Sequence, residues 1–146
     1  MADNTASNVT LDASGLTAVP SSSLACLADL ASLVLIDNAL TSLPILGSAA
    51  AGLQLTGLTV LDASANQITS LSATTFTGLA QLETLVLADN RITEIRPGTF
   101  TGLARLNYLV GRTFSCLRAA AAHTTYVLCG YPPPLPQPHL SEAWGV

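Results

Sequence analysis

The stretch Leu58-Thr-Val-Leu-Asp-Ala-Ser-Ala-Asn-Gln-Ile-Thr-Ser-Leu71 recurs 24 residues later as Leu82-Glu-Thr-Leu-Val-Leu-Ala-Asp-Asn-Arg-Ile-Thr-Glu-Ile95. The same offset continues beyond the two stretches, because Phe76 is matched by Phe100. Self-similarity at a fixed period of roughly 20–50 residues is typical of solenoids, in which each repeat is one coil stacked on its neighbours. The sequence therefore predicts stacked coils.

The pattern extends less regularly in both directions. Residues 30–43 repeat its first half, and an irregular segment at 44–57 follows. An earlier copy lacks the asparagine, and matching Leu11 to Leu61 places Ala13 at a core position. We therefore expect coils at about 8–29, 30–57, 58–81 and 82–105, with a partial coil at 106–110.

Two residue types indicate how each coil is built. Leucines at alternate positions, such as Leu85 and Leu87, predict a strand with one face turned inward. The asparagine that follows has an amide group, which can satisfy buried backbone groups at the turn and link one coil to the next. Stacked Asn38, Asn66 and Asn90 are expected to form a ladder inside the solenoid.

The motif L-x-x-L-x-L-x-x-N-x-L/I resembles that of leucine-rich-repeat proteins. It stands at Leu30–Leu40 and Leu82–Ile92, and at Leu58–Ile68 with Ala63 for one leucine. The phenylalanine-bearing second half looks like the 24-residue class common in extracellular receptors and matrix proteins. The resemblance implies an α/β fold: a solenoid of four to five coils, with a short curved parallel sheet on its concave face. The convex segments would be loops, 3-10 turns or short helices.

The C-terminal part resembles the cysteine-bearing flank of extracellular repeat proteins, in a degenerate form. Phe114, Cys116 and Cys129 match that flank, whereas its Asn-Pro pair and one cysteine are missing. The resemblance implies a cap at 111–131 and a Cys116–Cys129 disulfide, although the odd number of cysteines leaves the pairing open. Residues 1–7 and the proline-rich 132–146 are expected to be a disordered start and a flexible tail.

The charge balance narrows the class of partner. The net charge is −4, the chain has no lysine, and its arginines all fall between Arg91 and Arg118. Nucleic-acid binding needs many cations to replace phosphate counterions, so it is disfavoured. No apolar run reaches the roughly 20 residues that span a bilayer, and the start of the chain does not read as a signal peptide. We expect a protein ligand and a monomer or weak dimer.

The concave face is the predicted binding surface, because strand residues between the core leucines point there. Val34, Val60 and Val86 are expected to form an apolar stripe, with Tyr108 and Arg112 as anchors, since tyrosine and arginine are favoured in hot spots. The alternative is that these residues only satisfy strand propensity. The predicted binding residues are Ser32, Val34, Ile36, Asp37, Val60, Asp62, Ser64, Thr84, Val86, Asp89, Tyr108 and Arg112.

The sequence shows no catalytic constellation, and we expect neither enzyme activity, a cofactor nor a metal. His123 lies between Cys116 and Cys129, but too few ligands accompany it. Asn8-Val-Thr is an N-glycosylation triplet that matters if the chain is secreted. The leading hypothesis is an extracellular or cell-surface binding module of a receptor, adhesion or matrix type. Two alternatives stay open: a cytoplasmic scaffold whose Pro133–Pro136 motif binds adaptor domains, and a regulatory fragment of a receptor kinase.

Overall fold

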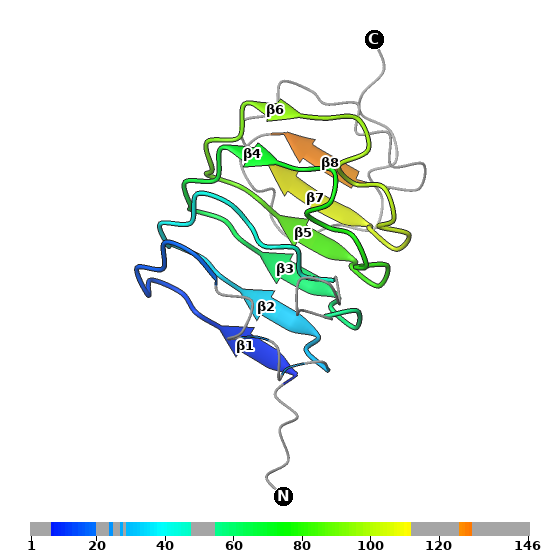
Figure 1. Cartoon of the computed structure of the whole chain (residues 1–146), viewed down its shortest axis with the longest axis horizontal. Helices are drawn as coiled ribbons and strands as arrows, with labels where there is room; N and C mark the ends of the chain where they lie inside the picture. The colour runs from blue at the N-terminus through cyan, green and yellow to red at the C-terminus, as the bar shows by residue number, and fades with distance from the viewer. Residues whose placement is uncertain are drawn as a thin grey trace, which may run out of the picture.

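The computed structural model describes residues 7–19, 24, 27, 29–47 and 55–111, together with the backbone of 126–129. Six strands form a parallel sheet in the order β1-β2-β3-β5-β7-β8, and β4 and β6 form a second, parallel sheet. Figure 1 shows the strands of the larger sheet stacked in chain order, and the described connections from β3 to β5 and from β5 to β7 each return the chain to the same end of the sheet. The strands are β1 (Asn8–Thr10), β2 (Ser32–Val34), β3 (Val60–Asp62), β4 (Ser70–Leu71), β5 (Thr84–Val86), β6 (Glu94–Ile95), β7 (Tyr108–Gly111) and β8 (Tyr126–Cys129).

The strands form where leucines alternate with other residues, as predicted. In β2, β3 and β5 the central leucine is buried and both flanking residues are half-buried. The leucines of successive strands are paired across the sheet, so that Leu33 lies beside Leu61 and Leu61 beside Leu85. The predicted fold class, a leucine-rich-repeat solenoid with a parallel sheet, is confirmed.

Turns make up the convex side of the regular coils. The Leu79 N–H donates to the Phe76 carbonyl at 3.2 Å, and the Leu82 N–H donates to the Leu79 carbonyl at 3.0 Å. The next coil repeats this arrangement around Phe100, and the two phenylalanine rings stack with centroids 5.8 Å apart. Because Phe76 is completely buried, the convex side supplies aromatic packing to a core that is otherwise aliphatic.

The asparagine ladder is present and joins each coil to the preceding one. Asn66 Oδ1 accepts a hydrogen bond from the Leu40 N–H at 3.0 Å, and its Nδ2 donates to the Leu35 carbonyl at 2.8 Å. Asn38 and Asn90 make the equivalent bonds one coil before and one coil after. The buried backbone groups at these turns therefore find partners in side chains, which removes the cost of burying them unpaired.

The first coil differs from the sequence-based alignment by two residues. Val9, not Leu11, pairs with Leu33, so Leu11 takes the position of Leu35 and Ala13 lies at a turn with φ of 46°. The alignment of Leu11 with Leu61 is therefore wrong. In a pattern of period two, either Val9 or Leu11 could be the central core residue of the strand. The inter-strand hydrogen bonds decide between them, such as the bond from the Leu11 N–H to the Val34 carbonyl at 2.8 Å.

The sheet continues past the fifth strand. Strand β8 lies within the segment for which the sequence predicts a cap, and it pairs in parallel with β7, with Gly111 beside Cys129. Cys116 lies outside the described residues, so the disulfide stays a prediction. Cys26, His123, the proline motif and most of the predicted start and tail also lie outside them.

The irregular second half of the second coil is held by core packing and by a close backbone contact. Leu46 and Leu55 are both buried, and the Leu55 N–H donates to the Leu46 carbonyl at 3.0 Å. The Gly47 backbone lies directly against Thr77 and Gly78 of the next coil, at a distance that leaves no room for a Cβ atom on either glycine. The described part of this segment at Gly47 is thus packed on the regular coil that follows it.

Candidate concave binding face

The register of the sheet arranges the concave side chains in rows that cross the strands. Parallel strands lie about 4.8 Å apart, so residues paired across the sheet are direct neighbours. The row nearest the start of the strands contains Asn8, Ser32, Val60, Thr84 and Tyr108. The second row contains Thr10, Val34, Asp62, Val86 and Val110. Ile36, Ser64 and Ala88 follow two residues further along their coils and are half-buried.

The predicted valine stripe is interrupted. Val34 and Val86 belong to the second row, but Asp62 lies between them, and Val60 belongs to the first row beside Ser32 and Thr84. The prediction of one continuous stripe is therefore wrong. Val60 precedes the central leucine of its strand whereas Val34 and Val86 follow theirs, and this shift of two residues moves Val60 into another row. The face is a set of aliphatic groups around a central carboxylate.

The carboxylate of Asp62 is held by its own strand. Its Oδ1 accepts a hydrogen bond from the Ser64 N–H at 2.9 Å and another from the Ser64 hydroxyl at 2.6 Å. Both residues are half-buried. This arrangement fixes the orientation of the acid, and no described residue donates to its other oxygen.

Asp37 and Asp89 lie at the turns beyond the strand ends. Their φ angles are 54° and 53°, and both residues are exposed. Aspartate is one of the few residues that enters this left-handed region readily, because its short polar side chain can bond locally. Ala65 occupies the same position in the third coil with φ of 51°. The two acids therefore lie at the edge of the face rather than among the valines.

The C-terminal end of the face is more enclosed. Tyr108 is half-buried in β7, whereas Val110 is 8% exposed and is buried, unlike its half-buried row neighbours Val34 and Val86. Arg112 lies outside the described residues, so its predicted role as an anchor is not tested. At the opposite end, Asn8 is exposed and belongs to the first row. The sequence singled out Asn8 only as a glycosylation triplet, because the shifted alignment of the first coil hid its place on the sheet.

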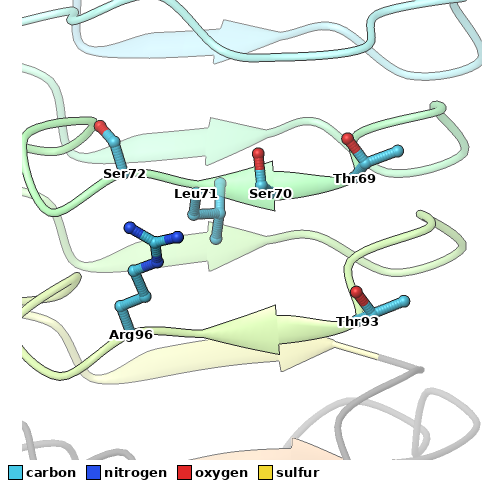
Figure 2. A pocket seen from close by; sticks show the side chains of 6 residues that line it. All are labelled: Thr69, Ser70, Leu71, Ser72, Thr93 and Arg96. Carbon is cyan, nitrogen blue, oxygen red and sulfur yellow. The ribbon is translucent and has the colours of Figure 1, made fainter.

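A hollow lies away from this face, beside β4 and β6. It has a volume of about 240 Å³ and is lined by Thr69, Ser70, Leu71, Ser72, Thr93 and Arg96. Figure 2 shows Thr69 and Thr93 on successive coils and the Arg96 side chain extending toward the coil that carries Leu71 and Ser72. The hollow is partly open and is lined by one cationic side chain and several hydroxyl groups. Among the described residues there is no group of three or more His, Cys, Asp or Glu that could hold a metal ion.

Comparison with known proteins agrees with this architecture. Residues 56–110 match the family model described as leucine rich repeat. The structure resembles an internalin from Listeria monocytogenes, with a TM-score of 0.50 and 20% sequence identity. That match covers 73% of this chain and 35% of the internalin, so the chain spans about a third of that structure. No curated protein sequence matches the chain significantly.

The repeats, the asparagine ladder and the family-model match over residues 56–110 show that this part of the chain is built of leucine-rich repeats. Its fold is the parallel solenoid that this repeat builds. In the part of the chain that the structure describes, no helix has both the length and the apolar character needed to cross a membrane.

Proposed function

We propose that the chain is a non-catalytic protein-binding module that uses the concave face of its sheet. The leucine-rich-repeat fold supports a role in protein binding. One observation carries the choice of face: four aliphatic side chains remain half-buried there, although the core leucines of the same coils are fully buried. They are Val34, Ile36, Val60 and Val86.

The backbone of this face favours binding because it is already ordered. Each inner strand is hydrogen-bonded on both sides within the sheet, and the asparagine ladder holds the turns that follow. A partner that docks on such a face loses little ordering entropy in the module, so more of the contact energy appears as affinity. The half-buried valines offer apolar area that a partner can remove from water.

The test is a double substitution that charges the face. Val34→Glu with Val86→Glu adds two carboxylates among the aliphatic groups, whereas Ala80→Glu with Ala104→Glu adds the same charge at exposed convex positions one repeat apart. Affinity capture with the full chain should retain a partner for wild type and the convex variant and lose it for the concave variant. Equal capture by all three proteins would refute the choice of face.

We further propose that the module works outside the cell or at its surface, with a receptor, adhesion or matrix role. The exposed side chain of Asn8, at the edge strand β1, supports this because a glycosylation triplet needs an accessible asparagine. After expression through a secretory pathway, glycosidase treatment should lower the apparent mass of the protein on a gel. Asn8→Gln should abolish that change in mass. Detection of free Cys116 and Cys129 thiols in native protein would count against this location.

A further inference from the structure

Asp62 is set among aliphatic groups on the concave face. Along its row it lies between Val34 and Val86, and along its own strand it follows Val60 by two residues, on the same face. The equivalent residues of the other coils are Thr10, Val34, Val86 and Val110, so among these five strands the third coil alone has a carboxylate in this row. The middle of the face therefore carries one negative charge within an apolar surrounding.

Nothing in the described part of the chain neutralises this charge. Lysine is absent from the sequence, and the described rows contain no arginine. The described arginines are all exposed and lie elsewhere: Arg91 after an asparagine of the ladder, Arg96 after β6 and Arg105 on the convex side. The hydrogen bonds from Ser64 reach only Oδ1, which leaves Oδ2 open to a donor from outside.

We propose that the partner of this face presents a lysine or arginine side chain, flanked by aliphatic residues, to Asp62. This inference rests on the proposed function. When a partner covers the valines, the Asp62 carboxylate also loses its contact with water. A cation placed over Asp62 donates a hydrogen bond to Oδ2 and offsets that loss. A neutral apolar partner would instead bury the carboxylate without compensation, which costs free energy.

The order of the residues in this row also sets the pattern of side chains in the recognised segment. An extended peptide that crosses the strands covers Val34, Asp62 and Val86 at intervals of about 4.8 Å. Its basic side chain therefore lies between two apolar contacts. The expected motif has one lysine or arginine between aliphatic side chains, rather than a run of basic residues.

The experiment uses a displayed library of random linear peptides selected on the full chain. Recovered peptides are first sorted by their binding to the variant with Val34→Asn and Val86→Asn, whose neutral polar side chains remove the apolar contacts without attracting a basic peptide. Those that lose binding are assigned to the concave face and are then tested on Asp62→Asn, with Asp37→Asn as the matched control at the exposed edge. Asparagine keeps the shape of each side chain and can still accept the bond from the Ser64 N–H.

We expect the concave-face peptides to be enriched in lysine or arginine with aliphatic neighbours. Their affinity should fall about tenfold or more on Asp62→Asn, since hydrogen bonds between charged groups are about twice as strong as neutral ones, and it should change little on Asp37→Asn. Concave-face peptides that lack a basic residue, or that tolerate Asp62→Asn, would overturn the inference and leave the proposed function standing. A selection whose peptides all ignore the two valine substitutions would refute the proposed function itself.

Discussion

Three glycines separate two physical effects that a single substitution would mix. Gly78 has φ of 87° and lies against the Gly47 backbone, whereas Gly102, its equivalent one repeat later, has φ of 94° and no described atom within 4 Å of the place that a Cβ atom would take. Gly47 has the close contact without a positive φ. Substitution of each by alanine therefore tests the backbone angle, the close contact, or both.

The expected losses of unfolding free energy follow from these contacts. A positive φ costs an alanine about 1–2 kcal/mol, and the more restricted unfolded chain returns about 0.4–1 kcal/mol. Gly102→Ala should thus cost about 1 kcal/mol. A Cβ atom on Gly47 would lie 2.8 Å from the Gly78 carbonyl carbon, and overpacking of this kind costs about 1–3 kcal/mol. Gly78→Ala combines both effects and should cost about 2–4 kcal/mol.

Urea denaturation followed by far-UV circular dichroism measures all three variants against wild type. The reasoning requires that Gly78→Ala lose clearly more stability than Gly102→Ala, and that Gly47→Ala lose stability although its φ is unstrained. Equal losses at Gly78 and Gly102, or a neutral Gly47→Ala, would show that the second and third coils do not approach this closely. The order of the three values is more informative than any one of them, because all three variants are measured with the same probe.

Three further outcomes can be measured by the same denaturation. Asn66→Ala should lower the unfolding free energy by about 2–4 kcal/mol, because it leaves the buried Leu40 N–H without its acceptor; exposed Asn107→Ala is the control, and equal effects would contradict the ladder's importance. A double-mutant cycle of Phe76→Leu and Phe100→Leu should show a coupling of about 0.5–1.5 kcal/mol, and no coupling would mean that the ring stack adds nothing to burial. Ala65→Asn should raise stability by up to about 1 kcal/mol, since asparagine tolerates a φ of 51° better than alanine, and a loss would argue against this strain.

Much of the concave face could be predicted because it follows from a period of two. Once Leu33, Leu61 and Leu85 are placed in the core, their neighbours must point to the opposite side of the strand. The row to which each neighbour belongs depends on which side of the central leucine it stands. The predicted stripe grouped Val60 with Val34 and Val86 without regard to their positions relative to the central leucine. The structure places Val60 in a different row from the other two.

The sequence by itself determined the repeat, the core leucines and the asparagine ladder, because each depends on a pattern that recurs within one chain at short range. Tertiary structure alone decided the register of the first coil, the extension of the sheet to β8 and the contact of Gly47 with Gly78. These features depend on hydrogen bonds and backbone contacts between coils, which a local pattern does not specify when a coil is irregular. The place of Asp62 between two valines belongs to the first group, since the 24-residue offset sets Asp62 opposite Val86 and the aligned motif sets it opposite Val34. The pairing of β2, β3 and β5 agrees with that alignment.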